Sequence, residues 1–128
     1  MQLLPPPTVF AAPRSRWREA FENDRVPAAG CVVSVGNFDG VHLGHAALAA
    51  RLREAAERRG LPAVAFTFDP HPASLVRPGA APVPLTTPAR RAELLLALGV
   101  DAVLVQRAGT ALIGLSAEAF YRDVLRGR

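Results

Sequence analysis

The stretch VGNFDGVHLGH, residues 35–45, places three glycines and two histidines within eleven positions. The residues before it, CVVSV at 31–35, are β-branched at their centre and predict a short buried strand that ends at Gly36. The residues after it, from about 44 to 59, repeat apolar side chains at helical spacing until Gly60, with Leu48, Leu52 and Ala55 on the expected apolar face. The quoted stretch is therefore expected to form the loop between a buried strand and an amphipathic helix.

Strands and helices continue to alternate further along the chain. AVAFTF at 63–68 predicts a second strand, parallel to the first because a helix connects the two. Thr87 is expected to cap a helix that starts at Pro88, and DAVLV at 101–105 predicts a third strand. A last helix is expected after the capping residue Ser116. This order predicts the α/β class, with a Rossmann-like, doubly wound parallel sheet that binds ligands outside the carboxyl ends of its strands.

The first part of the chain has a different character. Proline breaks alternate with one short helical candidate at 15–23, so residues 1–30 are interpreted as a lead-in segment. The start does not resemble a secretory signal and the single cysteine, Cys31, permits no internal disulfide, so a cytoplasmic location is expected. No uninterrupted apolar segment is long enough to cross a bilayer, and no membrane partner is expected.

The charge of the chain favours anionic ligands. All 15 basic residues are arginine, and the formal net charge is +4. The arginines are dispersed and no aromatic-rich stretch accompanies them, so nucleic acid is not the expected partner. The neighbours Arg90 and Arg91 are interpreted as part of a solvated helix face in preference to a phosphate clamp.

The glycines and histidines of the quoted loop predict a phosphate site. Glycines after a buried strand let the backbone approach a ligand, and the following helix N-terminus favours negative charge. The glycines are spaced by four residues rather than as G-x-G-x-x-G, which excludes the dinucleotide fingerprint. His42 and His45 can face one point and donate hydrogen bonds to a reacting phosphoryl group. A zinc site would need two more ligands, and neither Cys31 nor His71 is suitably placed, so no protein-bound metal is expected.

The loop also carries a family resemblance. GNFDGVHLGH resembles the H-x-G-H signature of the nucleotidylyltransferase superfamily. Together with TFDPHP at 67–72, LTTPARRAELLLALGVDAVLV at 85–105 and LSAEAF at 115–120, it resembles the FMN adenylyltransferase module of prokaryotic-type bifunctional riboflavin kinase/FAD synthetases. The similarity covers about residues 32–125 and implies that 31–128 is the N-terminal part of that domain. The resemblance implies transfer of AMP from ATP to FMN, with Mg²⁺, to give FAD and pyrophosphate.

The resemblance also implies roles for individual residues. His42 and His45 would bind the ATP phosphates and stabilise charge at the α-phosphorus. The ATP pocket would be shaped by residues of the first loop and the helix start, namely Gly36, Asn37, Phe38, Asp39 and Gly44. The flavin side would be lined by residues at the end of the second strand and after it, namely Phe68, Pro70, His71 and Pro72.

The resemblance has two gaps. The family usually has an aromatic residue after the third strand, where this chain reads Arg107-Ala108-Gly109. The chain also ends before the family's VGxDFxFG and ISST elements and before the riboflavin kinase domain. We therefore expect an incomplete site, weak or no synthetase activity from this chain alone, and an unpaired sheet edge that favours self-association.

Two alternative functions stay open from the sequence. A binding module could hold ATP or flavin through the same loops without turnover. A cytidylyltransferase-like enzyme could use another phosphorylated acceptor, although the DPHP segment at 69–72 disfavours this alternative.

Overall fold

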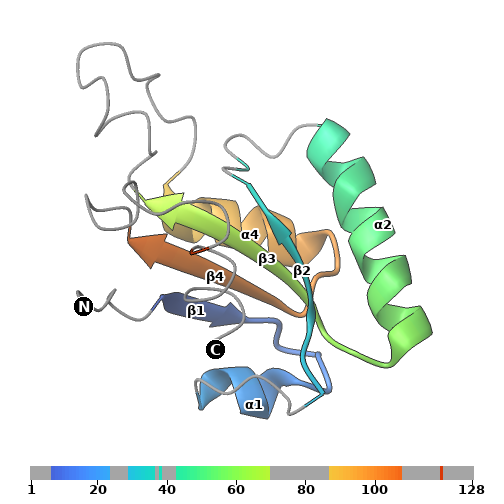
Figure 1. The fold of residues 1–128 in the computed structure, drawn as a ribbon. Coiled ribbons are helices and arrows are strands. Elements are labelled where there is room, and N and C mark those ends of the chain that lie inside the picture. Colours follow the sequence, from blue (N-terminus) through green and yellow to red (C-terminus); the bar gives the residue numbers. More distant parts are fainter. Residues whose placement is uncertain are drawn as a thin grey trace.

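A sheet of four strands organises the fold. The computed structural model describes residues 7–23, 29–36, 38, 43–69, 87–107 and 119. The strands are β1 (Thr8–Ala11), β2 (Val32–Val35), β3 (Ala63–Asp69) and β4 (Ala102–Arg107), in the spatial order β1-β4-β3-β2 (Figure 1). Strands β2, β3 and β4 run parallel, which confirms the predicted α/β class and its parallel sheet.

Helices cover both faces of the sheet (Figure 1). The helices α2 (Leu43–Arg59) and α4 (Pro88–Ala97) pack on one face, and the short α1 (Arg18–Glu22) packs on the other. The larger core lies under α2 and α4 and contains mostly small side chains, including Ala49, Ala56, Ala63, Ala65, Ala92 and Val103. The smaller core lies under α1, where Phe21 contacts Val64, Phe66, Ala102 and Leu104. Each face of the sheet is therefore buried, as the predicted apolar strands require.

The start of α4 follows the predicted capping chemistry. The Thr87 hydroxyl accepts a hydrogen bond from the backbone N–H of Arg90 at 3.1 Å, and Pro88 occupies the first helical position. The cap satisfies an N–H group that has no partner within the helix, and proline at the first position has no N–H to lose. The predicted start of this helix is confirmed.

The buried face of α2 differs from the expected one by a rotation of about one residue. Leu52 is buried as predicted, but Leu48 is 41% exposed. The inward positions are instead Ala49, Leu52 and Ala56. Alanines on this face allow the helix to approach the sheet closely, so the larger Leu48 side chain is left on the outer flank.

Strand β1 was not expected from the sequence. It lies within the predicted lead-in segment and pairs antiparallel with β4, with Thr8 opposite Val105 and Ala11 opposite Ala102. The run of five residues between Pro7 and Pro13 is too short to show strand alternation, and its conformation depends on a partner almost a hundred residues away. The predicted helix after Ser116 lies outside the described residues except at Ala119, which is helical.

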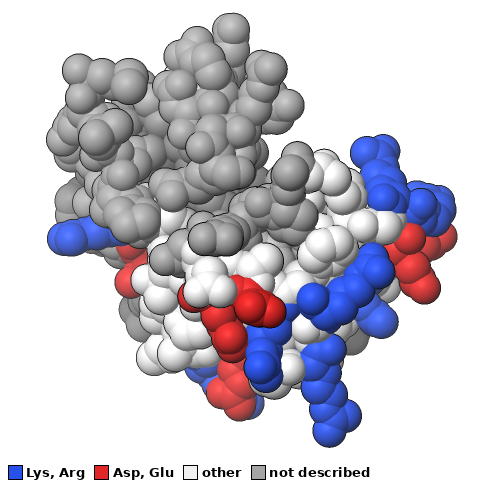
Figure 2. All heavy atoms as spheres, turned by 90° about the horizontal axis from the view of Figure 1, so that it is seen from below, with Lys and Arg blue, Asp and Glu red and all other residues white. Residues whose placement is uncertain are grey.

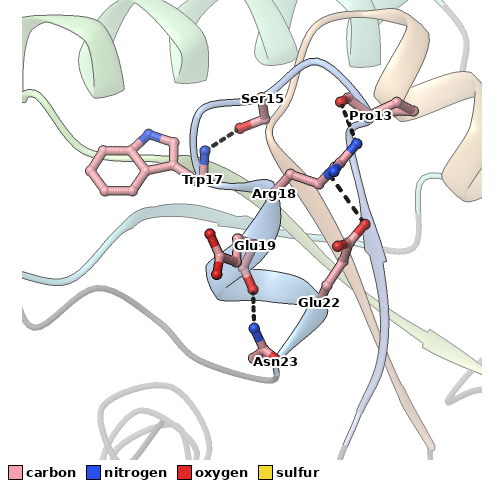
Figure 3. A network of polar contacts seen from close by, with 7 residues as sticks. All are labelled: Pro13, Ser15, Trp17, Arg18, Glu19, Glu22 and Asn23. Atoms are coloured by element: carbon pink, nitrogen blue, oxygen red, sulfur yellow. Dashed lines mark hydrogen bonds and ion pairs between the residues drawn. The ribbon is translucent and has the colours of Figure 1, made fainter.

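One carboxylate joins the amino ends of β3 and β4 to the connection after β1. Asp101 accepts from the Ser15 hydroxyl at 2.6 Å and from the Ala63 backbone N–H at 2.8 Å. Its backbone N–H donates to the Ala63 carbonyl, and its own carbonyl accepts from Ala12, both at 2.8 Å. Figure 3 shows the next contact, in which the backbone N–H of Trp17 donates to the Ser15 hydroxyl oxygen at 3.0 Å. This network attaches the N-terminal segment to the sheet.

None of the helices in the described ranges is both long enough and apolar enough to span a membrane.

Candidate functional site

The carboxyl ends of the three parallel strands form one edge of the sheet. Val35 is in register with Phe66, and Asp69 is in register with Arg107, so β2, β3 and β4 all end at this edge. Both of the loops predicted to bind ligands leave the sheet here, one after β2 and one after β3 (Figure 1). The ends of β2 and β3, from which the two loops leave, thus lie where ligands bind in open α/β sheets.

Phe38 connects the end of β2 to the start of α2. Its side chain is only 4% exposed and belongs to the larger core. The ring meets the His45 ring edge-on, with centroids 5.2 Å apart and an interplanar angle of 66°. Gly36 lies against the same ring, because a Cβ atom at Gly36 would be 3.3 Å from it. These contacts bring together three residues that the sequence assigned to the nucleotide site.

The backbone at Phe38 adopts an uncommon conformation. Its φ of +52° lies in the left-handed region, which costs energy for a side chain of this size. Burial of the ring and its contact with His45 hold this conformation. Backbone strain of this kind is often found where a loop is shaped for a ligand.

The first turn of α2 can receive an anion. Gly44 is exposed and His45, the third residue of the helix, is half-buried. No acidic side chain occupies this first turn, so no side-chain carboxylate in it neutralises the positive end of the helix dipole. Backbone N–H groups and an imidazole in this position suit a phosphate oxygen.

The flavin-side prediction is only partly within the described residues. Phe68 lies at the end of β3, half-buried, with its ring edge-on to Phe66 at a centroid distance of 5.6 Å. It packs against the core on the α1 side of the sheet. The other residues of the predicted site lie outside the described residues, namely Asn37, Asp39, His42, Pro70, His71 and Pro72.

The interpretation of Arg90 and Arg91 as a solvated helix face is wrong for Arg91. Arg90 is exposed and pairs with Glu93 at 2.8 Å, as expected for a solvated helix face. Arg91 is instead buried, with 6% of its surface exposed, and donates to the Phe68 carbonyl at 3.0 Å. The burial of Arg91 could have been inferred from the sequence, because Arg91 lies one helical turn before the buried Leu95 and therefore on the same face of the helix.

A cavity of about 640 Å³ lies at the opposite end of the sheet. Its walls include Arg53, Trp17 and Gly99, and arginines alternate with carboxylates on this face (Figure 2). Both α2 and α4 end beside it, and helix C-termini disfavour anions. Arg53 already donates to the Leu98 carbonyl at the end of α4. Of the other arginines in its walls, Arg16 lies over the Trp17 ring at 4.7 Å from the ring centroid.

The described residues contain no group of three or more potential metal ligands. Burial raises the pKa of the Cys31 thiol, so the thiol stays protonated at neutral pH. A protonated, half-buried thiol is a poor nucleophile and a poor metal ligand. Cys31 is therefore assigned no part in the chemistry of the loop.

Comparison with known proteins identifies the family. The sequence profile of FAD synthetase matches residues 25–128. This chain belongs to the FAD synthetase family. The match covers β2, β3, β4 and both loops of the candidate site, whereas β1 and α1 precede it.

Several bacterial proteins are similar to this member of the FAD synthetase family. The bifunctional riboflavin kinase/FMN adenylyltransferase of Escherichia coli (strain K12) is 40% identical over 101 residues, which are 79% of this chain and 32% of that protein. The protein of the same name from Pseudomonas fluorescens is 43% identical over 103 residues, 80% of this chain and 33% of the relative. The chain thus spans about a third of the length of these relatives.

A solved structure supports the fold. The crystal structure of a protein named macrolide-efflux protein from Streptococcus pneumoniae superposes with a TM-score of 0.65 and 27% sequence identity. The superposition covers 75% of this chain and 33% of the other.

Proposed function

We propose that this chain forms the ATP-binding part of an FMN adenylyltransferase, which transfers AMP from ATP to FMN and yields FAD and pyrophosphate. The contact of Phe38 with His45 and Gly36, between the end of β2 and the start of α2, supports this proposal most directly. It brings together three residues of the predicted nucleotide site in a chain of the FAD synthetase family. The names of the relatives supply the substrates.

The reaction needs positioning and charge stabilisation more than it needs a nucleophilic side chain. A phosphate oxygen of FMN attacks the α-phosphorus of ATP, and the bond from that phosphorus to the bridging oxygen breaks as pyrophosphate leaves. The N–H groups at the start of α2 hold the ATP phosphates, and His42 and His45 donate hydrogen bonds to the oxygens that gain charge. No covalent intermediate with the protein forms.

Mg²⁺ would act as a partner of the nucleotide rather than as a resident ion of the protein. The ion would neutralise charge on the ATP phosphates. Asp69, exposed at the end of β3, offers a carboxylate at this edge. A single carboxylate together with phosphate oxygens is a usual environment for Mg²⁺, so the described residues fit this ion.

The flavin would bind beside the nucleotide, where β3 ends. We assign Phe68, Pro70, His71 and Pro72 to this side of the site. The half-buried Phe68 offers an aromatic edge for an apolar ring system. We place the reaction in the cytoplasm, where a reduced Cys31 and a supply of ATP are both expected.

The test is to incubate the purified 128-residue chain with ATP, FMN and Mg²⁺, separate the products by chromatography, and measure ATP binding by calorimetry in parallel. FAD and pyrophosphate formed in equal amounts would support an adenylyltransferase. ATP binding without FAD formation would indicate a binding module. A folded chain that neither binds ATP nor forms FAD would refute the proposal.

Gly36→Ala is expected to weaken ATP binding by about tenfold, because the new methyl group lies 3.3 Å from the Phe38 ring and shifts this ring slightly against His45. Gly60→Ala is the matched control. Gly60 has a φ of +64° and open space around its Cβ position, so this substitution should cost about 1 kcal/mol of stability. Calorimetry should show an unchanged ATP affinity for Gly60→Ala, and equal affinities for both variants would contradict this account of the loop.

A further inference from the structure

We propose that Arg91 is a positioning residue that fixes the end of β3 and with it Phe68, a residue assigned to the flavin side of the site. This inference rests on the proposed function for the identity of the ligand, FMN. The hydrogen bonds themselves do not depend on that function.

Arg91 is the charged side chain found in the core among the residues that the structure describes. The other buried polar side chains in these ranges, Thr67 and Gln106, are neutral. Burial of a guanidinium is costly, and an apolar side chain of similar volume commonly serves stability as well or better. The placement of a buried cation therefore points to a use beyond packing.

The hydrogen bonds of Arg91 show what that use is. One nitrogen, Nη1, donates to the Phe68 carbonyl at 3.0 Å and lies 3.3 Å from the Thr67 hydroxyl oxygen. Thr67 is fully buried, so this contact is shielded from water. Arg91 thus ties the first turns of α4 to two consecutive residues at the point where β3 ends.

The bond to the Phe68 carbonyl fixes a particular peptide unit. The carbonyl and the N–H of Asp69 share one plane, so restraining the oxygen also restrains the direction in which the chain leaves the sheet. Phe68 is itself one of the predicted flavin contacts, and its ring is half-buried beside Phe66. A shift of this peptide would move Phe68 and leave the contact between Phe38 and His45 in place.

The experiment compares Arg91→Met, Arg91→Lys and the control Arg90→Met in the 128-residue chain. FMN affinity is measured by flavin fluorescence, ATP affinity by calorimetry, and mobility at 66–69 by hydrogen exchange. Loss of a hydrogen bond from a charged donor should weaken FMN binding by about tenfold in Arg91→Met, with ATP affinity changed by less than about twofold. Exchange at the end of β3 should increase. Arg91→Lys should recover part of both losses, and Arg90→Met should match the wild type.

Three results would overturn the proposal. The first is unchanged hydrogen exchange at 66–69 in Arg91→Met. The second is an equal loss of FMN and ATP affinity, which would show a general structural role. The third result concerns the case in which Arg91→Met does not fold. In that case, a folded Arg91→Lys variant with wild-type FMN affinity and wild-type hydrogen exchange at 66–69 would overturn the proposal. Failure of the wild type to bind FMN would instead refute the proposed function, while hydrogen exchange would still decide whether Arg91 anchors β3.

Discussion

The double variant His42→Ala, His45→Ala is expected to lower whatever adenylyl transfer the wild-type chain shows by at least about a hundredfold, because each imidazole donates to phosphate oxygens that gain charge in the transition state. ATP binding should weaken in the same variant, since the helix start keeps its N–H groups but loses two side-chain donors. FAD formation and calorimetric ATP affinity measure these two effects.

The control for this loss is His71→Ala. His71 belongs to the predicted flavin side, so this variant should retain ATP affinity while losing FMN affinity. His45 also packs against Phe38, and the thermal stability of each variant has to be measured to separate lost packing from lost chemistry. A stable double variant with wild-type ATP affinity and FAD formation would contradict the assignment of the histidines.

The second large effect is expected at Asp101, far from the candidate site. Asp101→Ala should lower the free energy of unfolding by about 2–4 kcal/mol, because the Ala63 N–H and the Ser15 hydroxyl both lose their partner in a partly buried position. Urea unfolding measures the loss. ATP affinity of the folded fraction should be unchanged, since the network lies at the amino ends of the strands.

Two milder variants calibrate this prediction. Ser15→Ala removes one of the two side-chain bonds to Asp101 and should cost about 1 kcal/mol. Arg18→Ala breaks an exposed ion pair with Glu22 at 3.4 Å, in the same segment (Figure 3), and should cost less than about 1 kcal/mol. A cost for Asp101→Ala no larger than that for Arg18→Ala would show that the network does not secure the N-terminal segment.

The elements that could be predicted are those whose signals are local. A β-branched run ending at Gly36 and an alanine-rich helical repeat specified β2 and α2. Thr87 followed by Pro88 specified the start of α4, because a cap needs only residues of its own helix. Burial of a particular helix face depends on the neighbouring elements, which is why Leu48 was placed on the wrong side.

The elements that could not be predicted depend on distant partners. β1 is a strand because β4 pairs with it, and Arg91 is buried because the end of β3 supplies acceptors for it. For the site, the sequence placed Gly36, Phe38 and His45 in one pocket, and the structure brings them into contact. The sequence did not indicate that the Phe38 side chain is buried in the larger core.

That the loop between β2 and α2 binds the ATP phosphates is tested most directly by an NMR titration of the ¹⁵N-labelled chain with ATP and Mg²⁺. We expect the largest amide shifts at Gly36, Phe38, Gly44 and His45, where β2 meets α2. Small shifts are expected at Arg53 and Gly99, beside the cavity at the other end of the sheet. Shifts concentrated at that cavity, or none at saturating ATP, would contradict the assignment of the phosphate site to this loop.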